Sequence, residues 1–210
     1  MLKKINKLLS AILIFQFSFV IILVVIKFSP KAIAATGYQG YAVGRDGAVL
    51  NLTLHNALMR TATTTDTNPV IHITGFGSSV IFDSWANFVG SNVYYGCYKP
   101  NSNPSSTDRD KVLVTAGILA LRGSNITYTA LGQIDYPSSV MNNPKVLPAD
   151  ISSIRCDGVV EYCNEYNNIR ITGSNAFWNI SIPSTDTINE HLLIKVTPSS
   201  QLANMTFVGY

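Results

Sequence analysis

The sequence predicts a single α+β domain in which helices and strands do not alternate regularly. The segments "NPVIHITG" (68–75) and "NVYYGCYKP" (92–100) are rich in β-branched and aromatic residues, which is typical of strands. Residues 109–122 and 153–166 instead carry apolar side chains at helical spacing. No repeat and no low-complexity linker interrupts the chain between them. This order favours an α+β fold over a regular βαβ arrangement.

The first part of the domain is expected to form irregular structure followed by short strands. Residues 38–54 alternate only loosely and contain several glycines, which we interpret as breaks. "LHNALMRTA" (54–62) is apolar around a polar pair and indicates a strand, and 68–75 is a clearer one. Within "SSVIFDSWANFVG" a short strand is followed by one or two helical turns at 84–89.

Two longer helices are expected in the second part. Asp108 is placed to cap a helix over 109–122, which Gly123 ends. A second helix begins at Ser153 or Ile154 and extends to Tyr166. Short strands at 169–171 and 191–198 and a terminal helix at 199–207 complete the expected elements.

Residues 1–34 are predicted to be a secretory signal peptide, and residues 35–210 the mature domain. Three lysines precede an apolar run from Leu8 to Ile26, and Ala32-Ile33-Ala34 is a cleavage sequence of the A-x-A type. An uncleaved anchor is the alternative, because about 19 apolar residues can just span a bilayer. We therefore expect a secreted or cell-envelope protein that is membrane-anchored only if the leader is retained.

The basic character of the chain belongs to this leader. The whole chain has 15 Lys and Arg against 12 Asp and Glu, a formal charge of +3. Five of the lysines lie in residues 1–34, which leaves 10 basic and 12 acidic residues, a net charge of about −2. The mature part has no cluster of Lys and Arg, so we expect no nucleic-acid partner.

Three cysteines, Cys97, Cys156 and Cys163, lie in the predicted mature domain. An odd number in an exported chain leaves at least one thiol without an internal disulfide partner. Cys97 is on a predicted strand and Cys163 is two turns into the predicted helix, so we expect both to be buried. The sequence leaves a Cys97–Cys163 disulfide open.

Cys156 is the candidate nucleophile, because it lies near the predicted start of its helix in "RCDG". The first N–H groups of a helix have no intrahelical partner, and the helix dipole is positive there. Such a position favours a thiolate and is expected to lower the thiol pKa. The same N–H groups can also receive the oxyanion of an acyl-transfer intermediate.

A cysteine nucleophile needs a base and a group that orients the base. His55 and His72 lie on consecutive predicted strands upstream of Cys156. Each alone is ordinarily a hydrogen-bonded core residue, but as a pair His55 can take the proton while His72 holds its other ring nitrogen. Asn56, Asp83 or a backbone carbonyl are alternatives for the role of His72.

Two acidic residues follow Cys156 on the same helix. Asp157 and Glu161 are four residues apart, and we expect a solvated helix face or a support for the nucleophile and its oxyanion site. The remaining histidine, His191, lies near the C-terminus in no recognised zinc spacing. We predict no metal and no cofactor.

The order "LHNALM", "PVIHITG", "RCDGVVEYCNEY" resembles the circularly permuted branch of the NlpC-like, papain-fold cysteine hydrolases, which includes YiiX-like bacterial proteins and lecithin:retinol acyltransferase. In that branch the histidine strands precede the cysteine helix. "SWANFVGSNVYYGCYKP" also resembles the family's stretch before its first long helix. The resemblance covers roughly residues 55–168. It implies an antiparallel sheet packed against the cysteine-bearing helix, with Cys156, His55 and His72 as the catalytic residues.

The resemblance and the leader together predict an exported bacterial cysteine peptidase or amidase. Peptide amides of the cell wall are the natural substrates for such an enzyme, and we expect a monomer. Two alternatives share the fold. One is an acyltransferase or lipid esterase with the same nucleophile, and the other is a secreted binding domain without catalysis.

Overall fold

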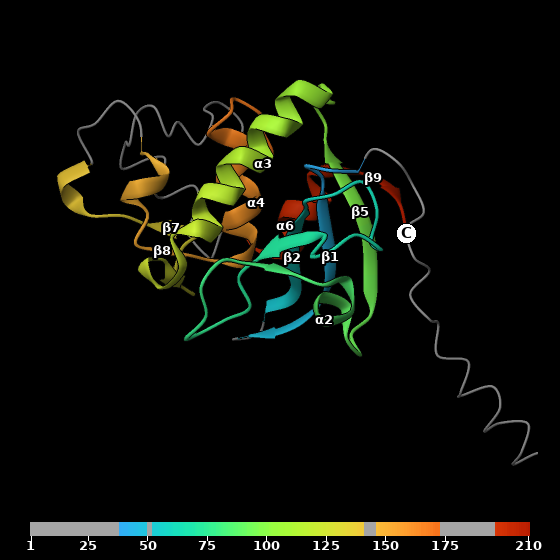
Figure 1. The fold of residues 1–210 in the computed structure, drawn as a ribbon, viewed down its shortest axis with the longest axis horizontal. Helices are drawn as coiled ribbons and strands as arrows, with labels where there is room; N and C mark the ends of the chain where they lie inside the picture. Colours follow the sequence, from blue (N-terminus) through green and yellow to red (C-terminus); the bar gives the residue numbers. More distant parts are fainter. Residues whose placement is uncertain (1–37, 50–51, 141–145, 173–195) are drawn as a thin grey trace, which may run out of the picture. The chain divides into compact units, whose positions relative to one another are not determined.

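A six-stranded antiparallel sheet with helices on both faces organises the domain in the computed structural model (Figure 1). The structure describes residues 38–49, 52–140, 146–172 and 196–210, which fall within one compact unit, Ala32–Tyr210. The strands are β1 (Ala42–Val49), β2 (Leu52–Met59), β3 (Val70–His72), β4 (Ile81–Asp83), β5 (Tyr94–Pro100), β6 (Thr127–Tyr128), β7 (Ile134–Asp135), β8 (Ser153–Ile154) and β9 (Met205–Gly209). The α-helices are α2 (Trp85–Val89), α3 (Ser106–Leu121), α4 (Cys156–Glu165) and α6 (Pro198–Ala203). Short 3-10 helices occupy Gly123–Asn125, Ser138–Val140 and Pro148–Asp150.

The main sheet has the order β4-β3-β2-β1-β5-β9, and every neighbouring pair is antiparallel. A smaller sheet has the order β6-β8-β7, in which β6 and β8 are parallel. The helix α4 packs against β2. The expected α+β class and the antiparallel sheet against the cysteine-bearing helix are therefore confirmed.

The prediction of irregular structure over 38–54 is wrong, because this region forms β1 and the start of β2. Two of its glycines are sites of close approach rather than breaks. A Cβ on Gly44 would lie 2.4 Å from Cδ1 of Leu202, and one on Gly47 would lie 2.7 Å from the Cβ of His55. Glycine is required there because neighbouring side chains occupy the space that a Cβ would fill.

The two faces of the sheet bury different clusters. Leu58 and Ile71 belong to the larger cluster with the buried residues of α3, α4 and α6, whereas Ala57 and Val70 pack with Phe88 of α2. In Figure 1, α3 and α4 lie side by side on one side of the sheet and α2 lies on the other. Since side chains alternate along a strand, His55 shares its face with Ala57 and points toward α2.

The helix α3 begins three residues earlier than expected. Ser105, and not Asp108, is its N-cap, and the Ser105 hydroxyl accepts a hydrogen bond from the backbone N–H of Asp108 at 3.2 Å. Asp108 therefore lies in the first turn, where its negative charge complements the helix dipole. Arg122 follows the last helical residue, close to the expected end.

The helix α4 begins later than expected, at Cys156. Ser153 and Ile154 pair with β6 and β7 as the short strand β8, which stops the helix from extending backward. Every residue of α4 is buried. Its first turn lies on the backbone of Gln133, where a Cβ on Gly158 would be 2.0 Å from the carbonyl oxygen.

The C-terminal predictions are partly wrong. The expected helix over 199–207 is limited to α6, and the chain then forms β9, which pairs with β5. Residues 169–171 form no strand. Most of the predicted strand at 191–198, with His191, and the predicted leader lie outside the described residues. In the part of the chain that is described, no helix combines the length and apolar character needed to cross a membrane.

The contact at Gly158 gives a test of this packing. Gly158→Ala should lower the free energy of unfolding by about 3 kcal/mol, because the new Cβ overpacks against a backbone carbonyl that cannot move away independently. Chemical denaturation followed by circular dichroism measures the effect. In the matched control Gly117→Ala, on α3, the Cβ meets no atom within 4 Å. This control should stabilise the protein by up to about 1 kcal/mol. Equal effects of the two changes would contradict the packing described here.

Candidate active site

Cys156 is the first residue of α4, and its side chain is only 1% exposed. Arg155 is the N-cap residue, and its side chain makes no capping hydrogen bond to the first turn. The backbone N–H groups of Asn56 and Asp157 lie near enough to the sulfur to act on its pKa. The thiol is therefore held between the start of α4 and the backbone of β2.

Burial decides the protonation of this thiol. The pKa of Cys156 is raised to about 12, first by burial and next by the negative charge of Asp157. The two N–H groups and the positive charge of Arg155 act in the opposite direction and do not compensate. The prediction of a lowered thiol pKa is wrong for the folded protein, because the loss of hydration outweighs the effect of the helix start. Cys156 is a neutral thiol at pH 7.

The other two cysteines are buried as expected, and neither forms a disulfide. Cys163 belongs to the cluster under the helices, whereas Cys97 belongs to the cluster on the α2 side of the sheet. The Cys97–Cys163 disulfide that the sequence left open is thus wrong, because the sheet lies between the two sulfurs.

Three side chains from adjacent strands form a hydrogen-bonded line on the α2 side of the sheet. Nε2 of His55 on β2 lies 2.7 Å from Nδ1 of His72 on β3. Nε2 of His72 lies 3.1 Å from Oδ2 of Asp83, the last residue of β4. The ring of Phe88 packs against both imidazoles, with centroid distances of 5.9 Å and 5.4 Å. The antiparallel order β4-β3-β2 brings together residues that are up to 28 positions apart in the sequence.

The pKa values fix the direction of these hydrogen bonds. The pKa of Asp83 is lowered by hydrogen bonds from Asn87, His72 and the Ser84 N–H, which outweigh its partial burial, so its carboxylate is ionised and accepts. Burial lowers the pKa of His72 despite the Asp83 carboxylate, and burial followed by the charges of His72 and Arg45 lowers the pKa of His55 well below 6.5.

Both imidazoles are therefore neutral at pH 7, and each carries one N–H. His72 donates from Nε2 to Asp83, so its Nδ1 must accept from Nε2 of His55. It follows that the proton of His55 is on Nε2 and that its Nδ1 carries a free lone pair. This is the form of imidazole that a general base requires.

The structure brings His55, His72 and Asp83 into direct contact, and it connects Cys156 to them through the backbone. No hydrogen bond joins the His55 ring to the sulfur among the described residues. Instead the backbone N–H of Asn56, the residue next to His55, lies near the sulfur and acts to lower the thiol pKa. The pairing of β2 with β3 covers only Leu58 and Met59, which leaves this earlier part of β2 accessible to α4.

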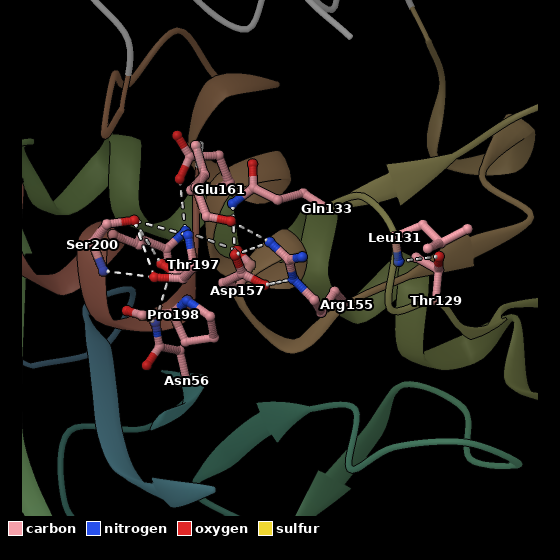
Figure 2. Close-up of polar contacts among 12 residues, drawn as sticks. Asn56, Thr129, Leu131, Gln133, Arg155, Asp157, Glu161, Thr197, Pro198 and Ser200 are labelled. Carbon is pink, nitrogen blue, oxygen red and sulfur yellow. Dashed lines mark hydrogen bonds and ion pairs between the residues drawn. The ribbon is translucent and has the colours of Figure 1, made fainter. Parts of the chain in front are cut away.

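Asp157, the residue after Cys156, lies in a buried polar network with Arg155 and Gln133 (Figure 2). Arg155 donates from Nε and Nη2 to the two oxygens of Asp157, at 2.5 and 2.8 Å, and both residues are fully buried. Gln133 donates to the same carboxylate at 3.0 Å. Glu161 accepts from Gln201 of α6 at 2.6 Å and is also fully buried. The solvated face considered for Asp157 and Glu161 is therefore wrong, and Asp157 instead anchors the start of α4.

The alternatives for the orienting residue can now be compared. The side chain of Asn56 is turned to the helical side of the sheet, where it donates to Pro198 O and to Gln201 Oε1, both at 2.9 Å. Asn56 therefore does not orient His55, whereas His72 does. Asp83 continues the line and does not replace His72. No cluster of three metal-ligating side chains occurs among the described residues.

One charged residue near this site was missed from the sequence. Arg45 lies directly opposite His55 in the β1–β2 pairing, with its Cζ 5.3 Å from the centroid of Phe88. The hairpin that places it there was not expected, because the glycines of residues 38–54 were interpreted as breaks. The only signal for this strand in the sequence was a loose alternation of apolar and polar residues that includes Val43 and Arg45.

Comparisons with known proteins add no independent assignment: no protein-family model, no curated protein and no solved structure matches this chain. The functional argument therefore depends on the geometry of the site.

The buried histidines predict a specific dependence of stability on pH. Above pH 6.5 both are neutral in the folded and in the unfolded chain, so their contribution to stability is complete. As the pH falls below 6.5, the unfolded chain binds protons that the folded chain does not. The free energy of unfolding should then fall by up to about 1.4 kcal/mol per pH unit for each histidine.

Urea denaturation between pH 7 and pH 5, with the double variant His55→Gln/His72→Asn alongside, measures this contribution. The comparison is necessary because burial also raises the pKa of Glu161. Lowering the pH therefore stabilises both proteins through Glu161, which opposes the effect of the histidines. The wild type should lose more stability than the variant over this range. Parallel curves would show that the histidines are not buried in the neutral form.

Proposed function

We propose that the protein is a cysteine hydrolase in which Cys156 attacks an amide or ester carbonyl and His55 is the general base. The observation that supports this most directly is the line from His55 through His72 to Asp83. It leaves a lone pair on Nδ1 of His55 in β2, the strand on which the helix of Cys156 packs. A purely structural pair of histidines does not need the ionised carboxylate at its end.

In this proposal the Cys156 thiol and the His55 imidazole are both neutral at rest, and the thiol proton moves to His55 during the attack. In the structure Cys156 belongs to the cluster on the α4 side of the sheet and His55 faces α2, so the start of α4 must move before the thiol reaches Nδ1 of His55. His55 then takes the thiol proton as the sulfur–carbon bond forms and the carbonyl electrons move to oxygen. The resulting imidazolium donates from Nε2 to His72, and Asp83 balances the new positive charge through His72. The proton then passes to the leaving amine or alkoxide, and water hydrolyses the thioester.

The start of α4 is the proposed oxyanion site. The side chain of the N-cap residue Arg155 makes no capping hydrogen bond, and the N–H of Asp157 lies near the sulfur and acts to lower its pKa. The Asp157 carboxylate, the one acidic group in this turn, is held by Arg155 and Gln133 and does not cap the helix. The N–H groups of Cys156 and Asp157 are therefore the proposed donors to the developing oxyanion.

The finer fold assignment and the substrate are part of the same proposal. The histidine strands come before the cysteine helix, and that helix packs on the antiparallel sheet, as in a circularly permuted, NlpC-like papain fold. With the predicted leader, this supports an exported bacterial peptidase or amidase acting on peptide substrates such as those of the cell wall. An acyltransferase or lipid esterase would use the same thioester and differ in the acyl group bound.

One observation favours a second candidate function, a secreted binding domain without catalysis. The Cys156 side chain is 1% exposed and its pKa is raised, so the resting thiol is neither accessible nor ionised. A hydrolase with this structure must open around the sulfur before substrate binds. A binding domain need not open, and its cysteine would stay unreactive.

Acylation by para-nitrophenyl acetate tests the two candidates. The hydrolase should release a burst of nitrophenolate and carry an acetyl group on Cys156, located by peptide mass spectrometry. Cys156→Ala should abolish the burst, and His55→Ala should slow acylation by about 10² to 10⁴. His72→Ala and Asp83→Asn should have smaller effects, because these residues act through His55.

The matched control is Cys163→Ala, which removes a thiol from the same helix and should leave the burst intact. Circular dichroism verifies that each variant is folded. Absence of an acetyl group on Cys156 in the folded wild type would exclude the hydrolase and leave the binding domain.

A further inference from the structure

Arg45 projects from β1 beside the candidate base. In the antiparallel register it is the direct partner of His55, and both side chains are on the α2 side of the sheet. Its guanidinium carbon lies over the ring of Phe88, which also packs against His55 and His72. The cation and the base are therefore supported by the same aromatic side chain.

The guanidinium is only partly used by the protein. Nη1 donates to the backbone carbonyl of Asp46 at 2.5 Å, and the buried Nε has no hydrogen-bond partner. Arg45 takes part in none of the ion pairs found among the described residues. A half-buried cation with an unused N–H and no paired carboxylate can accept an anion from outside.

Its acidic neighbours are already engaged. Asp83 accepts from His72, Asn87 and the backbone of Ser84. Asp46 accepts from the N–H of Val93 at 3.4 Å, and its carboxylate raises the pKa of the nearby Tyr95. Burial lowers the pKa of Arg45, and the nearby carboxylates of Asp46 and Asp83 partly oppose this effect without pairing with the guanidinium.

We propose that Arg45 binds a carboxylate of the acyl substrate beside the reacting carbonyl, so that the enzyme acts on anionic acyl groups such as acidic or carboxyl-terminal peptide units. This rests on the proposed function, since it assigns the substrate class of that same site. A guanidinium suits this role because its planar N–H groups match a carboxylate and keep their charge at any working pH.

The reagents iodoacetate and iodoacetamide test the assignment, because they differ mainly in the carboxylate. In both reactions the Cys156 sulfur forms a bond to carbon, iodide leaves with the bonding electrons and the thiol proton passes to His55. Rates of Cys156 modification by each reagent are measured in the full-length protein by peptide mass spectrometry. Arg45→Gln should lower the iodoacetate/iodoacetamide rate ratio about tenfold, a difference of about 1.4 kcal/mol. Arg45→Lys should lower the iodoacetate/iodoacetamide rate ratio by less than Arg45→Gln does.

Arg60→Gln is the matched control. Arg60 also packs on a phenylalanine, Phe82, at 5.5 Å, but its Nε and Nη2 donate to the carbonyls of Asn68 and Thr67. Its replacement should leave the ratio unchanged. Arg45→Gln and Arg45→Lys are compared with the wild type by circular dichroism before labelling.

The outcomes separate this inference from the proposed function. If Cys156 reacts with both reagents and Arg45→Gln leaves their ratio unchanged or slows both equally, the carboxylate assignment is wrong while the nucleophile stands. If Cys156 in the wild type reacts with neither reagent, the proposed function fails, and the substrate assignment fails with it.

Discussion

The site depends on the way the start of α4 is held, and two buried contacts hold it: the ion pair of Arg155 and Asp157, and Gln201, which donates to the Asp157 carbonyl and accepts from Asn56 of β2. Arg155 and Asp157 flank Cys156 in the sequence, and their side chains form a bidentate pair with no exposure to solvent. Arg155 also donates to the carbonyl of Val196 at 2.7 Å, which connects the helix start to the segment before α6. Loss of one partner of such a pair typically costs about 3–5 kcal/mol, because the other charge stays buried.

This attachment also sets the chemistry of the thiol. Close packing of the first turn on β2 removes water from the sulfur, so burial outweighs the helix start and the thiol is neutral. On the other face of the sheet, burial against Phe88 of α2 keeps the imidazoles of His55 and His72 neutral. The proposed mechanism therefore moves a proton within a neutral pair, supported by the remote charge of Asp83. A preformed thiolate–imidazolium pair would need a more hydrated site.

Local sequence patterns were sufficient for much of the fold but not for the long-range contacts. The strand at β3, the turn-like helix α2 and the position of Cys156 near a helix start follow from periodicity and capping. The strand β1 was not predicted, since Gly44 meets the distant Leu202 of α6 and Gly47 meets His55 only because the hairpin folds back, and Arg45 was missed with it. Asp83 was considered as a substitute for His72, whereas the order of β2, β3 and β4 places it behind His72. The low thiol pKa expected for Cys156 was wrong because burial is a tertiary property.

The central claim, that His55 serves Cys156 as a base, is tested most directly by the pH dependence of Cys156 alkylation with iodoacetamide in the wild type and in His55→Ala. Cys97 and Cys163 are internal references in the same digest. The account predicts that Cys156 in the wild type reacts near neutral pH in a His55-dependent manner. In His55→Ala its alkylation should shift to a single rise above pH 9. Superimposable profiles in the two proteins, or a Cys156 as inert as Cys97 and Cys163, would contradict the account and make Cys156 a structural residue.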